Sequence, residues 1–188
     1  VPSVLVFLSI VMQEGQTLIK GYQRDRIMAF FDPATYADTE AYQQLNSVIA
    51  IGSGQLWGKG LNNTDIASVK NGNFLPESQT DFIFAVIGEE LGFVGSAVVI
   101  LLLILIAMRC VSIARVAKDT AGMVIAAGMG SLIGIQGFMN IAVATMMMPN
   151  TGLPLPFVSY GLSSLVSMYI GIGFVLNVGL QRKNLYNL

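Results

Sequence analysis

Residues 75–92 read LPESQTDFIFAVIGEELG, and this stretch decides the fold class. A polar, acidic segment runs without a break into an apolar helix, and Asp81 stands at the junction. The apolar run continues over residues 82–108 and is interrupted only by Glu89 and Glu90. It exceeds the roughly 20 residues that cross a hydrocarbon core. The stretch therefore predicts a membrane-spanning helix whose polar end carries a carboxylate, which at that depth must be solvated, paired or used.

The composition of the 188-residue chain also indicates a membrane protein. Hydrophobic residues make up 54% of it and charged residues 11%, whereas a soluble domain has about 25% charged residues. The predicted fold is all-α, a polytopic membrane helix bundle, and the chain is expected to be a fragment of a longer protein. The predicted segments are a span at 1–19, an extracellular loop at 20–80, a span at 81–108, a cytoplasmic link at 109–120, a span at 121–148, an extracellular turn at 149–159, a span at 160–180 and a cytoplasmic tail at 181–188.

The distribution of charge orients these segments. The short link and the tail together carry a net charge of +4, contributed by Arg109, Arg115, Lys118, Asp119, Arg182 and Lys183. The long loop, up to and including Asp81, has five basic and seven acidic residues. Short basic loops remain in the cytoplasm. The long loop, the turn at 149–159 and Asp81 are therefore predicted to face the outside.

The long loop is predicted to contain helices that lie in the membrane interface. Residues 22–31 (YQRDRIMAFF) interleave charged and apolar side chains, as interfacial helices do. Residues 42–51 (YQQLNSVIAI) suit a second interfacial or a re-entrant helix. In the glycine-rich segment 52–60 that follows, Lys59 is a candidate for contacting a phosphate, since glycines allow close backbone approach. A glycine turn with Trp57 anchored in the interface is the simpler alternative.

Small residues recur at helical spacing in the spans. Gly88 and Gly92 form a GxxxG pair on the helical face of Asp81, and Gly130 and Gly134 form another. Such pairs permit close contact between helices. Both glycine pairs are therefore predicted at helix–helix interfaces.

The spans also contain polar side chains. One of Glu89 and Glu90 is expected to be buried in a hydrogen-bond network, and a proton relay is the alternative. Gln136 and Asn140 stand four residues apart and are expected to form hydrogen bonds across helices.

Residues 150–161 read NTGLPLPFVSYG, which is not a helical sequence. Its prolines prevent a regular helix and its glycines allow tight bends. Non-helical backbone at membrane depth is tolerated only where protein covers it or where it lines a cavity. The segment is predicted to fold over the outer mouth of a cavity, with Ser159 and Tyr160 pointing into it. A stiff extracellular turn is the alternative.

The chain contains no histidine and a single cysteine, Cys110. The lack of histidine excludes His-based general bases, Ser–His and Cys–His nucleophiles and HExxH zinc sites within this chain. One cysteine allows neither an intrachain disulfide nor a thiolate cluster. A carboxylate therefore becomes the leading candidate for a general base.

The motifs LPESQTDFIFAVIGEELGFVG and LPLPFVSYG, with AIGSGQLWGKGLNN upstream and QGFMN between them, resemble the SEDS family (shape, elongation, division and sporulation). Its members include RodA, FtsW and SpoVE, and the motifs look most like the RodA type. The resemblance covers essentially the whole chain and corresponds to the C-terminal four spans of a ten-span fold. Two positions depart from the family pattern: Gln79 stands where many members have histidine, and Leu162 stands where many have glycine.

The resemblance implies a peptidoglycan glycosyltransferase that polymerises lipid II into glycan strands. The reaction would occur at the outer face of the bacterial cytoplasmic (inner) membrane and would serve cell wall synthesis in elongation, division or sporulation. The implied partners are lipid II, membrane lipids and a class B penicillin-binding protein, and no nucleic acid is expected. The essential acid of the family, in its TDF motif, falls on Asp81.

The chemistry of that reaction agrees with the residues present. A sugar hydroxyl attacks an anomeric carbon and displaces a lipid diphosphate, so a base must take the hydroxyl proton, and Asp81 is the predicted catalytic residue. The diphosphate leaves as a stable anion and needs only positive charge nearby. A divalent cation (Mg²⁺ or Mn²⁺) between Asp81 and Glu77 is one possible source of that charge, and no organic cofactor is expected. The predicted substrate-binding residues are Lys59, Lys70, Glu77, Gln79 and Ser159.

Three alternatives remain open from the sequence. On composition alone, without the family motif, a structural role for Asp81 at the start of a helix is favoured. A lipid-linked precursor flippase would need essential polar residues deep in the spans. A non-catalytic membrane scaffold that activates a penicillin-binding protein would tolerate the loss of Asp81.

Overall fold

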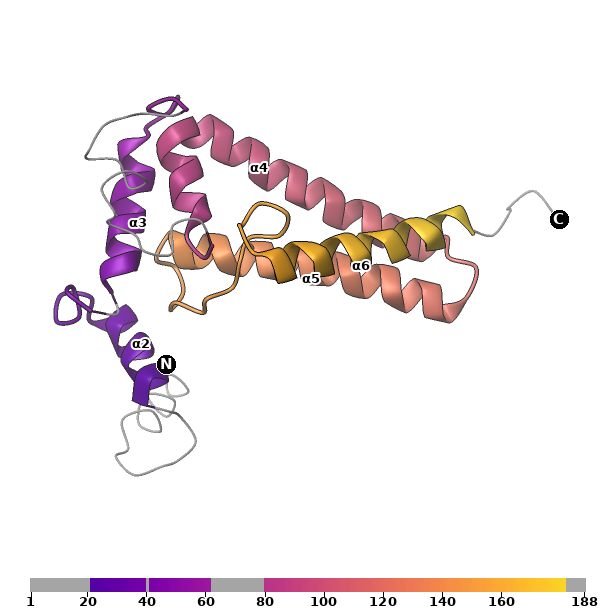
Figure 1. The fold of residues 1–188 in the computed structure, drawn as a ribbon, viewed down its shortest axis with the longest axis horizontal. Helices are drawn as coiled ribbons and strands as arrows, with labels where there is room; N and C mark the ends of the chain where they lie inside the picture. The colour runs from indigo at the N-terminus through magenta and orange to yellow at the C-terminus, as the bar shows by residue number, and fades with distance from the viewer. Residues whose placement is uncertain (1–20, 40, 62–79, 182–188) are drawn as a thin grey trace, which may run out of the picture.

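The computed structural model describes residues 21–39, 41–61 and 80–181, and every regular element within these ranges is a helix. The prediction of an all-α fold is confirmed. Figure 1 shows that α4, α5 and α6 form a bundle and that α3 lies across one of its ends, which we call the α3 end. The helices are α2 (Gly21–Phe31), α3 (Tyr42–Ser53), α4 (Ile83–Arg115), α5 (Thr120–Ala144) and α6 (Leu162–Leu180).

Three of these helices are long and apolar enough to cross a membrane. α4 has 33 residues, α5 has 25 and α6 has 19. At 1.5 Å per residue even α6 extends over about 28 Å, close to the thickness of a hydrocarbon core. These helices correspond to three of the four predicted spans, and the predicted span at 1–19 lies outside the described residues.

The C-terminal ends of α4 and α5 differ from the predicted bounds by several residues. α4 continues through Arg109 to Arg115, so the link between α4 and α5 comprises residues 116–119 rather than 109–120. Long basic side chains can reach the headgroups while their backbone stays helical, so an arginine does not mark a helix end. α5 ends at Ala144 rather than at 148, because Met146 has a φ of 58° that is incompatible with a continuing helix.

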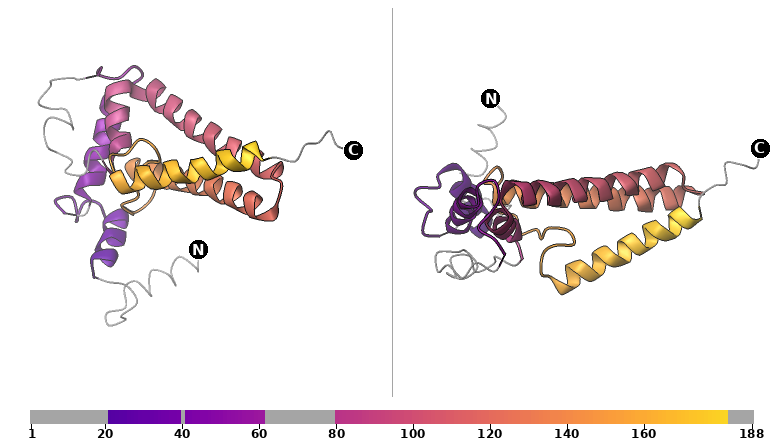
Figure 2. Two further views of the ribbon diagram at one scale, coloured as in Figure 1. Left: turned by 45° about the vertical axis from the view of Figure 1, so that its right-hand side comes forward. Right: turned by 90° about the horizontal axis from the view of Figure 1, so that it is seen from above.

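Small residues bring α4 and α5 together. A Cβ atom added at Gly130 would lie 3.0 Å from the carbonyl oxygen of Ala107 and 3.0 Å from the Cβ of Cys110. The predicted close helix contact is thus confirmed at Gly130. Figure 2 shows α6 joining the other two helices near the 116–119 link and diverging from them towards the α3 end.

Two buried polar side chains fasten α3 to the end of α5. The Nε2 of Gln44 donates to the carbonyls of Val143 (3.1 Å) and Met148 (2.8 Å). The hydroxyl of Ser47 donates to the carbonyl of Ala144 at 2.7 Å. The last carbonyls of a helix have no donors within the helix. α3 therefore supplies hydrogen-bond donors to carbonyls at the C-terminal end of α5, and it covers this end of the bundle.

α4 is broken at Gly92, whose φ of 66° and ψ of −163° are not helical. Residues 83–91, which we call the short arm, lie beside α3, and the longer remainder of α4 runs along α5 (Figure 1). The predicted small-residue face is therefore interrupted. Gly88 contacts α3, where an added Cβ would lie 2.9 Å from the Cγ1 of Ile51. Gly92 instead forms the bend, since its φ lies in a region that favours glycine.

Candidate active site

Asp81 lies immediately before the short arm of α4, at the α3 end of the bundle. The N-cap residue of α4 is Phe82, whose side chain makes no capping hydrogen bond. Asp81 therefore does not serve as the N-cap, although a carboxylate so close to a helix start still gains from the helix dipole. The Phe82 side chain is buried in the core while Asp81 is half-buried. The acid is thus placed at the surface of a firmly packed segment.

Two side chains from other elements hold the backbone of this segment. The Nδ2 of Asn140, in the last part of α5, donates to the carbonyl of Asp81 at 2.7 Å. The hydroxyl of Ser159, in the segment between α5 and α6, donates to the carbonyl of Thr80 at 2.6 Å. Both donors are buried. The main chain at the acid is consequently fixed from two sides.

The carboxylate of Asp81 lies against Gly152. A Cβ atom added at Gly152 would lie 3.3 Å from the Oδ2 of Asp81. Gly152 has a φ of 67°, a conformation that L-residues with side chains rarely adopt. Backbone rather than a side chain therefore borders this side of the acid.

The irregular segment that contains Gly152 is pinned by two amides of α5. Asn140 donates a second hydrogen bond to the carbonyl of Leu153 at 2.7 Å, and Gln136 donates to the carbonyl of Pro154 at 2.8 Å. Gln136 thus bonds to the irregular segment rather than to a helix. Asn140 bonds both to that segment and to the carbonyl of Asp81, where the second span was predicted to begin. The Oδ1 of Asn140 is buried and makes no hydrogen bond within the described part of the chain.

The structure places Ser159 differently from the sequence prediction. Its side chain is 2% exposed, and its hydroxyl accepts from the amide of Leu155 at 2.6 Å as well as donating to Thr80. Both hydrogen-bonding capacities are used within the protein, so the hydroxyl does not point into an open cavity. The next residue, Tyr160, is 72% exposed. Ser159 supports the backbone beside Asp81.

Lys59 forms an ion pair with Glu89 of the short arm. The distance from Nζ to Oε1 is 2.8 Å, with the Glu89 side chain 2% exposed and the Lys59 side chain 28% exposed. The expectation that one glutamate of the span is buried in a polar network is confirmed for Glu89. The amine predicted to contact a diphosphate has a carboxylate partner in this structure.

Three other predicted site residues, Lys70, Glu77 and Gln79, lie outside the described residues. The carboxylate pair of Asp81 and Glu77 therefore stays a prediction as a metal site. Among the residues that the structure describes, no three side chains of His, Cys, Asp or Glu come together as metal ligands would.

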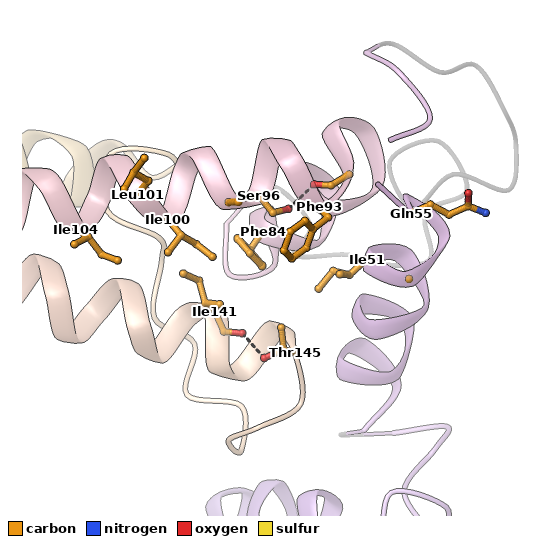
Figure 3. Close-up of a pocket in the computed structure, with 13 residues that line it drawn as sticks. Ile51, Gln55, Phe84, Phe93, Ser96, Ile100, Leu101, Ile104, Ile141 and Thr145 are labelled. Carbon is orange, nitrogen blue, oxygen red and sulfur yellow. Dashed lines mark hydrogen bonds between the residues drawn. The ribbon is translucent and has the colours of Figure 1, made fainter. Parts of the chain in front are cut away.

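An apolar groove of about 620 Å³ lies between α3, α4 and α5, starting at the Gly92 bend. In Figure 3, side chains of Ile51, Phe84, Ile100 and Ile141 face a common space. Its two hydroxyl-bearing residues, at positions 96 and 145, donate to carbonyls of their own helices. Asp81 does not line this groove. The groove therefore offers apolar surface but no group for acid–base chemistry.

Two neighbours of Asp81 were not predicted as such from the sequence. Asn140 was expected at a helix interface and Gly152 at a bend, and neither assignment connected them to the acid. Asn140 lies 59 residues from Asp81 in the chain. The sequence drew attention to Asn140 only as a polar side chain in an uncharged span, and to Gly152 only as a glycine near prolines.

Comparison with known proteins identifies the family. The family of cell cycle proteins that includes FtsW, RodA and SpoVE matches residues 1–184. A probable peptidoglycan glycosyltransferase FtsW from Nitrosomonas europaea is 40% identical over 169 residues, which cover 88% of this chain and 42% of that protein. The peptidoglycan glycosyltransferase MrdB of Escherichia coli K12 is 42% identical over 168 residues, 89% of this chain and 45% of that protein.

A solved structure is also similar to this chain. It is reported as the structural coordination of polymerization and crosslinking by a peptidoglycan synthase complex, and one of its chains matches with a TM-score of 0.69 and 28% identity. The match covers 97% of this chain and 49% of that chain. The chain thus spans less than half the length of the relatives it matches. It belongs to the family of cell cycle proteins that includes FtsW, RodA and SpoVE.

Proposed function

We propose that the whole protein to which this chain belongs is a peptidoglycan glycosyltransferase that polymerises lipid II, with Asp81 as its general base. The names of its relatives support the reaction type. The observation that carries the proposal is the construction around Asp81. Asn140 and Ser159 fix the backbone of residues 80–81 from two other elements, and the backbone of Gly152 borders the carboxylate of Asp81. A carboxylate that only stabilised a helix start would not need backbone anchors from distant segments, yet Asn140 lies 59 residues from Asp81 and Ser159 lies 79 residues from Thr80.

The proposed step is a displacement at an anomeric carbon. The hydroxyl oxygen of the acceptor sugar forms the new glycosidic bond, and its proton passes to the carboxylate of Asp81. The bond from the anomeric carbon to the lipid diphosphate breaks, and the diphosphate leaves with the electron pair. Fixed backbone on both sides of the acid keeps the proton acceptor in one place, which lowers the entropic part of the barrier.

The leaving diphosphate requires positive charge. We assign this role to Lys70 and to a divalent cation held by Asp81 and Glu77, as the sequence suggests. When bound, the cation would neutralise the charge that develops on the diphosphate. Lys59 is a weaker choice for this contact because its amine lies 2.8 Å from the buried carboxylate of Glu89.

A transport function is less well supported. A path for a lipid-linked sugar needs polar side chains that face an open route through the spans. Here Glu89 pairs with Lys59, and Gln136 and Asn140 donate to backbone carbonyls. Their positions are explained by structure rather than by passage of a polar head group.

The membrane orientation and the partner are part of the same proposal. The positive-inside rule favours a cytoplasmic 116–119 link and an α3 end at the outer face, where Asp81 would meet lipid II. A class B penicillin-binding protein is the proposed partner, because the matched solved structure is one of a complex of polymerization and crosslinking.

The test is glycan-strand formation from purified lipid II by the full-length protein with its partner. Wild type is compared with Asp81→Asn, which keeps the size of the side chain and removes the base. We expect Asp81→Asn to lower the rate by about a hundredfold or more. The matched control is Asp119→Asn at the opposite end of α5, where an asparagine still caps the helix.

Folding and partner binding are measured for both variants by thermal unfolding and co-purification. Polymerisation by Asp81→Asn at the rate of Asp119→Asn would refute the base assignment. Transport would be favoured instead if the wild-type protein moved lipid II from one leaflet of vesicle membranes to the other and formed no glycan.

A further inference from the structure

The bend at Gly92 leaves the backbone of α4 incomplete. In a continuous helix the amides of Phe93 and Val94 would donate to the carbonyls of Glu89 and Glu90. Here Phe93 donates to the carbonyl of Gln55 at 2.8 Å. Val94 donates to the carbonyl of Leu56 at 3.2 Å. Residues 54–60, which we call the clasp, therefore supply both missing acceptors.

The clasp also supplies both missing donors. The amide of Lys59 donates to the carbonyl of Glu89 at 2.9 Å, and the amide of Gly60 donates to the carbonyl of Glu90 at 3.0 Å. These four backbone groups on the two sides of the bend are thus paired with the clasp. Such groups are costly to leave unsatisfied away from water.

Glycines allow this backbone contact. A Cβ atom added at Gly54 would collide with the carbonyl oxygen of Gly88, and one added at Gly58 would collide with the carbonyl oxygen of Glu90. Gly58 also has a φ of 77°. The glycine-rich segment that the sequence predicted as a turn is therefore packed against α4. Its glycines allow the two backbones to come close.

The ion pair of Lys59 and Glu89 crosses the same contact. Because Glu89 is almost fully buried, its charge depends on partners in the protein. Lys59 retains some exposure to solvent. Removal of Lys59 therefore affects a buried carboxylate, whereas removal of Glu89 affects an amine that can reach solvent.

The clasp holds one end of the short arm, and Asp81 stands at the other. Asn140 and Ser159 fix the main chain at residues 80–81, and the clasp fixes it at residues 89–94. The short arm, residues 83–91, joins these anchors as a helix that begins two residues after the acid. A shift of the arm at the clasp therefore displaces Asp81.

We propose that Lys59 is a positioning residue for Asp81: it compensates the charge of the buried Glu89 carboxylate, so that the clasp can dock on the bend of α4 and keep the acid in place. This inference rests on the proposed function of Asp81. It assigns Lys59 a role through Glu89 and not through contact with the diphosphate.

The test compares Lys59→Met, Glu89→Gln and the double variant in the full-length protein with its partner, using lipid II as substrate. Lys59→Met is expected to lower kcat by about a hundredfold with KM little changed, because displacement of a catalytic group by about 1 Å costs that much. Glu89→Gln is expected to lose less than about tenfold, since Lys59 can turn to solvent. Lys118→Met, in the 116–119 link, is the control for loss of a lysine.

The double variant separates the two roles of Lys59. With both charges removed the clasp can dock again, so kcat should recover about tenfold or more from the Lys59→Met value. If Lys59 instead contacts the diphosphate, the double variant will be no better than Lys59→Met and KM will rise. Either of these results would overturn the proposal.

Amide hydrogen exchange of the same proteins provides a measure that needs no activity. Lys59→Met should accelerate exchange at residues 89–94 and at residues 80–85, and the double variant should reverse both changes. Unchanged exchange at residues 80–85 in Lys59→Met would refute a link between the clasp and Asp81. Absence of glycan synthesis by wild type would count against the proposed function, while the exchange data would still decide whether the clasp positions the acid.

Discussion

The side-chain amide of Asn140 donates to the backbone carbonyl of Asp81 at 2.7 Å and to that of Leu153 at 2.7 Å. One side chain of α5 thus joins the start of α4 to the irregular segment before α6. The carboxylate of Asp81 and the Gly152 beside it take their relative position from this shared donor. The geometry of the site therefore depends on α4, on α5 and on the irregular segment before α6.

Asn140→Leu should impair both stability and polymerisation. The substitution keeps the approximate volume but removes the donors to two carbonyls, which should cost about 2–4 kcal/mol of the free energy of unfolding. The control is Asn177→Leu on an exposed face of α6. Thermal unfolding and glycan synthesis are measured for both, and equal behaviour of the two variants would contradict the role given to Asn140.

Gly152→Ala should lower activity more than it lowers stability. An alanine at a φ of 67° costs about 1–2 kcal/mol, and its Cβ would lie 3.3 Å from the Oδ2 of Asp81. Gly173→Ala in α6 meets no atom within 4 Å and should be neutral or stabilising by up to about 1 kcal/mol. A rate of glycan synthesis in Gly152→Ala equal to that of Gly173→Ala would show that crowding beside the acid does not matter.

Ser159→Ala should reduce kcat and leave KM for lipid II unchanged. The hydroxyl holds the carbonyl of Thr80 and accepts from the amide of Leu155, so its loss should cost about 1–3 kcal/mol of stability. Ser167→Ala, an exposed serine of α6 that bonds its own helix, is the control. Steady-state kinetics decide: a raised KM with normal kcat would restore Ser159 as a substrate contact.

Gly54→Ala should dislodge the clasp, whereas Gly52→Ala should not. The added methyl group at position 54 meets the backbone of Gly88, which cannot move aside, while position 52 has no neighbour within 4 Å. We expect a loss of about 3 kcal/mol or more for Gly54→Ala and almost none for Gly52→Ala. Thermal unfolding of the two full-length variants measures this difference, and similar midpoints would argue against a tight clasp.

The sequence was sufficient to predict the helices of the described residues and to single out Asp81 as a candidate. Long uncharged runs predicted the spans because few residues other than apolar ones tolerate a hydrocarbon core. The interleaved charges of residues 22–31 and the pattern of residues 42–51 predicted two further helices, and α2 and α3 form there. Asp81 was found because a carboxylate is conspicuous at the end of an apolar run.

The contacts between distant segments could not be predicted in the same way. No local pattern reveals that Lys59 reaches Glu89, or that Asn140 reaches Asp81, because these pairs depend on how the helices pack. The bend of α4 was also missed. Gly92 fits a small-residue face of a straight helix equally well, and only the docking of the clasp makes a broken helix the more stable conformation.

The exchange of hydrogen bonds at Gly92 has a consequence for how the protein is made. A bent α4 without the clasp would leave two donors and two acceptors unsatisfied, and a clasp without the bend would leave the same number. The two must therefore form together. The clasp precedes α4 in the chain, so it is synthesised first and is present when α4 emerges. The order of segments along the chain thus allows the membrane helix to acquire its bend as it assembles, without passing through a long-lived state with exposed polar backbone.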